Sequence, residues 1–380
     1  MIWKRMIIIL LCLNVSLTAM PVSGMTICRA KAIKKATFAF LDVGQGNAGL
    51  IKVGSNSVLI DTGRAGEYDT LKKQLDKLNV SVVNTLIVSH PDSDHMESAD
   101  RIISEYKVKR IIMPQIKSDT RCYQRMMDAV KKRKVKVLNP ETGQQIELAA
   151  GCRAKVLSVD AGDNDKNEAS IVMRVTYGDR SFLYMGDATA RVESGILESG
   201  ENIASDVYLM SHHGSDTANG VLFVKSVLSS KYKNAVISVG ADNSYGHPDK
   251  FVLGRVQKYA AKVYRTDKNG GIVYKTDGNS LKVSFIKVKH SKTDSYVPSR
   301  TYTSPRKDYS SKSRDGKDNN STDNSSTDNS STADDKVYVY VTKTGKKYHK
   351  DGCRYLNASK IKIRLGEAKG KGMTACSVCY

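Results

Sequence analysis

Residues 318–335 contain only Asp, Asn, Ser and Thr apart from Ala333, arranged as an imperfect repeat of Asn-Ser-Ser-Thr-Asp. A segment without apolar side chains cannot offset the conformational entropy that folding removes. We therefore predict that residues 291–335 form a disordered Ser/Thr/Asn/Asp-rich linker, and that one continuous core cannot include the whole chain. The linker separates a large predicted domain, residues 36–290, from a small one, residues 336–380.

The N-terminal residues have the pattern of a leader. Lys4 and Arg5 precede an apolar stretch, residues 6–13, and the small residues Val22 and Gly24 follow it. The stretch is shorter than the ~20 residues that cross a bilayer. Residues 1–24 are predicted to be a signal peptide, or alternatively an uncleaved N-terminal anchor. Either way we expect an exported protein, extracellular or attached to the cell surface, and no polytopic membrane domain.

The charge of the chain is strongly positive. The 380 residues include 60 Lys and Arg against 39 Asp and Glu, a formal net charge of +21. The small domain carries 11 basic and 2 acidic residues, whereas the linker carries 7 and 8. Basic surfaces attract polyanions because binding releases condensed counterions. We expect nucleic acid as a partner, with an anionic cell-envelope polymer as the alternative.

Short β-like runs alternate with amphipathic stretches in the large domain, which predicts a layered α/β fold. Polar residues of interest follow the strands, where α/β folds place their chemistry. The clearest strands are 37–42, 57–61, 85–89, 110–113, 181–186, 206–210 and 235–239, and the clearest helices are 70–78, 122–131 and 251–261.

A cluster of possible metal ligands follows the apolar strand at 85–89. Imidazoles and carboxylates at this density predict two divalent ions, either Zn²⁺ or Mn²⁺. The first three ligands alternate in sequence, so their side chains could converge where the strand ends, while the fourth begins the next helix. Later ligands follow other strands, and one of two paired histidines would close the second site. The predicted ligands are His90, Asp92, Asp94, His95, Asp187, His212 and His213.

Two ions about 4 Å apart lower the pKa of a shared water and stabilise both oxygens of a displacement. Asp94 and His247 are the residues that we expect to act in catalysis, with His247 donating a proton to the leaving oxygen or contacting a phosphate. The alternative for His247 is an ordinary turn residue before Pro248. Asp61 is expected to orient the His90 loop by hydrogen bonds, or else to be a turn aspartate before Gly63.

Several motifs occur in the order found in metallo-β-lactamase-fold hydrolases, and they most resemble the extracytoplasmic hydrolase domain of ComEC-type competence proteins, which take up DNA. The motifs are FLDVGQG, LIDTG, SHPDSDH, the segment with Asn167 and Ser170, YMGDA, SHHGS, ISVGADNSYGHP and YRTDKNGGIV. The resemblance covers roughly residues 37–285. It implies an αββα sandwich with a dinuclear metal site along one edge of the sheets.

The chain departs from the superfamily pattern in ways that affect the expected site. Asp92 stands where a histidine is usual, and Asn167 stands near the position of a further histidine ligand, so Asn167 is expected to support an oxygen-rich site. ComEC-type domains share these two features. They usually have Asp at the position of Asn47, however, and a Gly-Gly pair where this chain has Glu97 and Ser98.

The small domain contains one imidazole and three thiols in two short clusters, which is the spacing of a closed structural zinc site. About 45 residues rarely fold on apolar burial alone, so a structural metal is physically reasonable. The module resembles zinc-ribbon-like modules, although a disulfide among the same cysteines is the rival interpretation. Pairing of Cys122 with Cys152 is equally open. The predicted zinc ligands are His349, Cys353, Cys376 and Cys379.

Together these features favour an exported dinuclear metal-dependent hydrolase, a phosphodiesterase or nuclease acting on DNA. One alternative is an exported metallohydrolase of a lactone or a small phosphoester. The other is a catalytically silent protein that binds nucleic acid or a cell-wall polymer.

Overall fold

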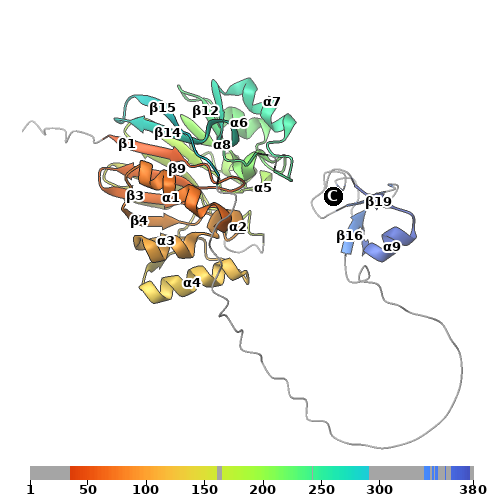
Figure 1. Cartoon of the computed structure of the whole chain (residues 1–380). Helices are drawn as coiled ribbons and strands as arrows, with labels where there is room; N and C mark the ends of the chain where they lie inside the picture. The colour runs from red at the N-terminus through yellow and green to blue at the C-terminus, as the bar shows by residue number, and fades with distance from the viewer. Residues whose placement is uncertain are drawn as a thin grey trace, which may run out of the picture. The chain divides into compact units, whose positions relative to one another are not determined.

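The computed structural model describes residues 35–160, 165–241 and 243–290, and within 338–376 it describes residues 338–342, 345, 347–349, 356 and 361–376. These residues fall into two compact units, a larger one made of the described residues up to 290 and a smaller one made of those from 338 onward (Figure 1). The predicted leader, residues 1–24, and the predicted linker, residues 291–335, lie outside the described residues.

The larger unit contains two mixed sheets. The described strands of the first sheet lie in the order β15 (Leu281–Ile286), β14 (Gly271–Thr276), β1 (Ala36–Phe40), β2 (Gly49–Val53), β3 (Asn56–Ile60), β4 (Val82–Ile87), β5 (Lys107–Ile112) and β6 (Lys136–Leu138). Those of the second lie in the order β13 (Lys262–Arg265), β12 (Asn234–Ile237), β11 (Val207–Leu209), β10 (Arg180–Tyr184), β9 (Val172–Tyr177), β8 (Cys152–Ser158) and β7 (Gln145–Ala149). Strands β3 to β6 are parallel to one another, as are β10 to β13.

Helices cover the outer face of each sheet, which confirms the predicted sandwich of two sheets between two helical layers. The first sheet packs against α1 (Tyr68–Lys77), α3 (Ala99–Glu105) and α4 (Arg121–Arg133), and the second packs against α5 (Ala190–Glu198), α6 (Val221–Val227) and α7 (Lys250–Tyr259). Figure 1 shows α3 and α4 together beyond β4, and α6 and α7 together near β12. The short helices α2 (Ser93–Met96) and α8 (Thr266–Asn269) follow β4 and β13.

The core between the sheets includes a group of stacked aromatic rings. Phe38 of β1 stacks on Phe182 of β10 with ring centroids 3.8 Å apart, and Phe40 lies 5.6 Å from Tyr184. All five residues of β10 are buried, as are all but one of β1, because both faces of these strands are covered. A continuous apolar run is the pattern expected of such strands. The rigid inter-sheet contact fixes the loops that leave both sheets at one edge.

The two buried cysteines of the larger unit are free thiols. Cys122 belongs to the core under α4, whereas Cys152 belongs to the core between the sheets. They lie on opposite faces of the first sheet and cannot form the disulfide that the sequence left open. No helix within the described residues is both long enough and apolar enough to cross a bilayer.

The described strands of the smaller unit form a sheet in the order β18 (Ile361–Arg364), β16 (Tyr338–Val341), β17 (Lys347–His349) and β19 (Thr374–Ala375). Helix α9 (Leu365–Gly370) comes directly after β18 in the chain. β17 and β19 are parallel neighbours, and the amide of Cys376 donates to the carbonyl of Tyr348 at 2.9 Å. His349 and Cys376 are therefore both buried at the ends of adjacent strands. The other two predicted zinc ligands, Cys353 and Cys379, lie outside the described residues.

Candidate metal centre

The predicted ligands converge at one edge of the sandwich, four from the first sheet and three from the second. His90 and His95 follow β4 of the first sheet, while Asp187 follows β10 and His213 follows β11 of the second. Each of these strands runs parallel to a neighbour, so their carboxyl ends project loops into the same region. Side chains more than a hundred positions apart in the sequence are thereby brought together.

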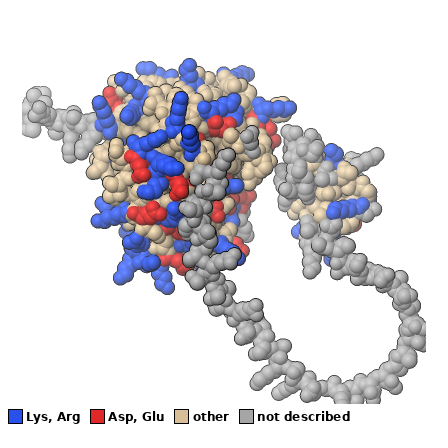
Figure 2. All heavy atoms as spheres, in the orientation of Figure 1, with Lys and Arg blue, Asp and Glu red and all other residues tan. Residues whose placement is uncertain are grey.

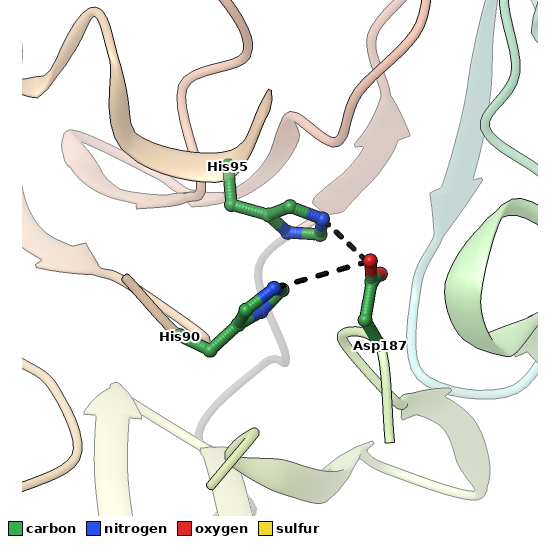
Figure 3. A group of neighbouring side chains, drawn as sticks. All are labelled: His90, His95 and Asp187. Carbon is green, nitrogen blue, oxygen red and sulfur yellow. Dashed lines mark ion pairs between the residues drawn. The ribbon is translucent and has the colours of Figure 1, made fainter. Parts of the chain in front are cut away.

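One group of buried ligands consists of His90, His95 and Asp187. Figure 3 shows both imidazoles turned toward the Asp187 carboxylate. Nε2 of His95 lies 3.1 Å from Oδ1 of Asp187, and Nε2 of His90 lies 3.9 Å from Oδ2. These three side chains supply two nitrogens and one carboxylate, which suits Zn²⁺ and also Mn²⁺.

A second group consists of Asp94, His95 and His213. Nε2 of His213 lies 3.2 Å from Oδ2 of Asp94 and 3.7 Å from Oδ2 of Asp187. His95 belongs to both groups, and a single ring nitrogen binds one ion. Two ions would therefore require a further ligand from the rim of the site.

Hydrogen bonds on the far side of each imidazole fix which nitrogen faces the site. Nδ1 of His95 lies 2.8 Å from Oδ2 of Asp61, and Nδ1 of His213 lies 2.9 Å from the carbonyl of Ser238. Both partners are acceptors, so both Nδ1 atoms carry the proton and donate it. In the neutral ring Nε2 is then an unprotonated lone pair directed at the cluster, as in metal-binding histidines.

Asp61 connects these bonds to the His90 loop. Its carboxylate accepts from the amide of Ser89 at 2.7 Å and from the Ser89 hydroxyl at 2.8 Å, in addition to His95. Because the Ser89 hydroxyl donates to Asp61, it can accept from Nδ1 of His90, 3.1 Å away. Asp61 thus makes the hydrogen bonds proposed for it.

Buried acceptors without hydrogen bonds test whether this cluster suits a cation. Among the described residues, Nε2 of His90, Nε2 of His95, Oδ1 of Asp187 and Oδ1 of Asn167 are buried and make no hydrogen bond. Buried polar atoms are normally paired, and acceptors that face one another repel unless a positive charge lies between them. The residues therefore fit a divalent ion.

The charge states of His90, Asp94 and Asp187 also suit metal binding. Burial would lower the pKa values of His95 and His213, but the carboxylates beside them raise both above the ordinary value, so a cation bound by Nε2 of either ring would displace a proton. Burial, followed by the nearby His95, lowers the pKa of His90 to about 3, so this imidazole is neutral. Burial alone would raise the pKa of Asp187, but His95 and His213 hold it well below its usual range. For Asp94, burial acts to raise the pKa, but the close contact with His213 and the neighbouring His95 outweigh it and lower the pKa. Neutral imidazole and ionised carboxylate are the forms that bind cations.

The remaining predicted ligands lie at the rim. Oδ2 of Asp92 is 3.8 Å from Nε2 of His90, and its Oδ1 is 3.3 Å from Nζ of Lys166. Nε2 of His212 is 3.7 Å from Oδ2 of Asp187, and its Nδ1 bonds with the Thr217 hydroxyl at 3.1 Å. Neither belongs to the two compact groups, although either lies close enough to complete a site.

The local backbone differs from the expected extension of the strand. β4 ends at Ile87, and Asp94 lies within the helical turn α2, so His90, Asp92 and Asp94 do not alternate along a strand. The turn brings Asp94 and His95 in as consecutive helical residues, and both belong to the group that contains His213. Convergence depends on this turn and on the opposite sheet.

Unusual backbone angles place the ligands of the second sheet. His212 and His213 both have positive φ, 49° and 54°, which is unfavourable for side chains with a Cβ. Gly186 also has positive φ, 55°, and a Cβ there would lie 2.9 Å from Oγ of Ser170 and 3.1 Å from Cβ of Ser89. The glycine allows the loop carrying Asp187 to approach the His90 loop.

An open hollow of about 410 Å³ lies over the cluster. Its described lining is polar and comes from both sheets. Sequence reasoning missed two of these residues, Gln45 and Tyr245, although both lie inside motifs that carried the resemblance, GQG and SYGHP. The lining residues are Gln45, Asp92, Asp94, Asn167, Asp187, His212, His213, Tyr245 and His247.

The larger unit has a metallo-β-lactamase-type fold with a candidate His/Asp metal site. In agreement with this, residues 41–147 match the model of the metallo-beta-lactamase superfamily. The crystal structure of the metallo-beta-lactamase fold protein YhfI from Bacillus subtilis is similar, with 12% identity and a TM-score of 0.43, over 62% of this chain and 98% of that one.

The chain is distantly homologous to competence proteins. It is 29% identical to ComE operon protein 3 of Bacillus subtilis over 254 residues, which is 62% of this chain and 32% of that protein. It is 27% identical to Competence protein ComA of Neisseria gonorrhoeae over 270 residues, 70% of this chain and 36% of that protein. Recombination protein 2 of Haemophilus influenzae is 29% identical over 277 residues, 70% of this chain and 32% of that protein. The chain thus spans about a third of the length of these relatives.

Proposed function

We propose that this chain is an exported metal-dependent hydrolase of phosphodiester bonds, with DNA as its substrate. The observation that carries the proposal is the set of buried, unpaired acceptors of His90, His95 and Asp187 at the base of an open hollow. The distant homology to competence proteins supports nucleic acid as the substrate class. Export follows from the leader predicted in residues 1–24.

The ligands named above would hold two divalent ions, Zn²⁺ or Mn²⁺, with Asp92 or His212 completing the set that shares His95. Bound ions supply an activated water and neutralise charge that develops on the phosphodiester. In the smaller unit, His349 and Cys376 would contribute to one structural zinc. Asn167 lines the hollow and has a buried Oδ1 that makes no hydrogen bond, so this oxygen can accept one from a bound water.

The chain's own side chains have distinct tasks in this reaction. Asp94 is ionised and only partly buried, so its carboxylate can orient an incoming water by accepting a hydrogen bond from it. Burial, with His212 and His213, lowers the pKa of His247 to about 4. At neutral pH the His247 ring is thus uncharged and retains one N–H to donate to a substrate oxygen.

The basic surface would help hold the polyanion. Figure 2 shows Lys and Arg side chains spread over the visible face of the larger unit, with Asp and Glu among them. This distribution favours general attraction of a phosphate backbone and not a single defined stripe on that face. The small unit, whose segment 336–380 has 11 basic and 2 acidic residues, is proposed to add to this attraction.

A substrate screen tests the proposal. Full-length protein is supplied with Zn²⁺ or Mn²⁺ separately and assayed on single-stranded DNA, duplex DNA, RNA, a lactone and a small phosphoester, beside Asp94→Ala. We expect cleavage of DNA by the wild type and a loss of at least 100-fold in Asp94→Ala. Activity confined to the lactone or small phosphoester would contradict the proposal. So would salt-dependent binding of DNA by a protein that takes up no ion.

A further inference from the structure

Tyr245 lines the hollow over the candidate ligands, and neither the packing of the fold nor the ligand cluster accounts for an aromatic residue there. It follows β12, lines the hollow together with Asp94, Asp187 and His247, and is 59% exposed. A ring this exposed contributes little to stability through burial. Single exposed apolar residues are common on protein surfaces, so exposure alone would mean nothing.

The ring is nevertheless held in place. It stacks on the His247 ring with centroids 5.8 Å apart and an interplanar angle of 14°. Its hydroxyl accepts a hydrogen bond from Nη2 of Arg64 at 3.2 Å. Arg64 belongs to the loop after β3 of the first sheet, so Tyr245 is tied to both halves of the sandwich.

Further hydrogen bonds hold the segment of Tyr245 and His247 on one side and Arg64 on the other. The Asn243 side chain accepts from the amides of Tyr245 and His247, at 3.2 and 3.0 Å, and donates to the His247 carbonyl at 2.7 Å. On the other side, the Ser98 hydroxyl donates to the carbonyl of Arg64 at 2.9 Å. One face of the Tyr245 ring therefore rests on His247 while the remaining surface is presented to solvent beside the hollow.

A fixed, exposed ring beside a metal cleft suits a flat ligand. Stacking on a ring that is already oriented costs little entropy, and every nucleobase has a π face that such a ring can accept. The faces of bases inside a duplex are covered by their neighbours, so only an unpaired or terminal base can use the platform. Arg64 adds a positive charge at the edge of the ring, close to where a phosphate would lie.

We infer that Tyr245 is a stacking platform for an unpaired nucleobase next to the phosphodiester in the hollow, and that it makes the enzyme prefer single-stranded DNA. This inference rests on the proposed function, because it assumes that the hollow accepts a polynucleotide. Stacking on His247 and the hydrogen bond from Arg64 hold the Tyr245 ring in its orientation.

Binding to an oligonucleotide that contains 2-aminopurine tests the platform, because the fluorescence of this base falls when it stacks. Full-length protein loaded with Zn²⁺ or Mn²⁺ is titrated with single-stranded and duplex forms of the same sequence, made with phosphorothioate linkages that resist cleavage. Tyr245→Phe keeps the stacking face and loses the bond to Arg64, whereas Tyr245→Leu is apolar without an aromatic face. Phe285→Leu removes an aromatic ring of similar exposure, 46%, on β15 and serves as the matched control.

We expect the wild type and Tyr245→Phe to quench the single strand, and Tyr245→Leu to bind it about 5- to 150-fold more weakly without quenching. Phe285→Leu should behave as the wild type. Equal affinity and equal quenching in Tyr245→Leu would overturn the inference, as would tighter binding of the duplex. These results differ from a failure of the proposed function, in which the wild type itself neither binds nor cleaves any polynucleotide.

Discussion

Asp61→Asn is the substitution that most directly tests how the ligands are oriented. Asparagine has the same shape as aspartate and tolerates the positive φ of residue 61, 58°. If its oxygen keeps the bond from the Ser89 amide, its NH₂ group faces Nδ1 of His95, which is also a donor. His95 would then shift its proton to Nε2, the atom that faces Asp187, and could no longer bind a cation there.

The size of the effect follows from the role of such hydrogen bonds. Loss of a partner that orients a ligand weakens metal binding by about 10- to 100-fold, equivalent to about 1.4–2.7 kcal/mol. The measurement is competition for Zn²⁺ and for Mn²⁺ against a fluorescent chelator, with circular dichroism to establish that the variant is folded.

Asp206→Asn provides the matched control. Asp206 is also a buried aspartate that accepts from the amide and hydroxyl of one serine, Ser181, at 3.0 and 3.5 Å, but it precedes β11, whereas the metal ligands follow the strands. Its replacement should lower stability and leave metal affinity unchanged. If folded Asp61→Asn binds both ions within twofold of the wild type, or if the control loses as much affinity, the reasoning about the tautomer is wrong.

Three further predictions concern the site and its surroundings. Gly186→Ala should weaken metal binding at least tenfold, because positive φ and a close contact both oppose a Cβ there; normal affinity would contradict this. His213→Ala should weaken binding of the second ion more than His212→Ala in calorimetric titrations, since only His213 belongs to a compact group. Burial acts to lower the pKa of His290, but its contacts with Glu67 and Asp42 raise the pKa overall. The charged ring should therefore stabilise the fold below about pH 6.5, and this contribution should be lost as the pH rises through the raised pKa. Urea unfolding of His290→Gln should therefore differ from the wild type at pH 6 and much less at pH 9.

The sequence predicts strand positions well where a strand is buried on both faces. The runs at 37–42, 85–89 and 181–186 overlap β1, β4 and β10, and each contains consecutive buried apolar residues, at 38–41, 86–88 and 182–185. Strands β7 to β9 are harder to predict, since they mix charged and apolar residues at an edge of the second sheet. The pairing of the two sheets came only from the resemblance, because periodicity does not encode it.

For the candidate site, the sequence identifies residue types and leaves their geometry open. The ligand-rich segment from His90 to His95 is conspicuous because so many imidazoles and carboxylates rarely pack together. The choice between His212 and His213 could not be made, because it depends on left-handed backbone angles and on a carbonyl of Ser238 that lies 25 positions away. Tyr245 was also missed, since an isolated tyrosine gives no signal until Arg64 is placed beside it.

Because the candidate ligands come from both sheets, metal binding should affect the stability of the protein as well as its activity. An ion held jointly by His95 and Asp187 would act as a non-covalent cross-link between the two sheets, and any ligand that binds only the folded state raises its stability by mass action. Resistance to heat and to proteases should then rise with the free concentration of Zn²⁺ or Mn²⁺ around the protein. Scarcity of metal would shorten its survival as well as its activity.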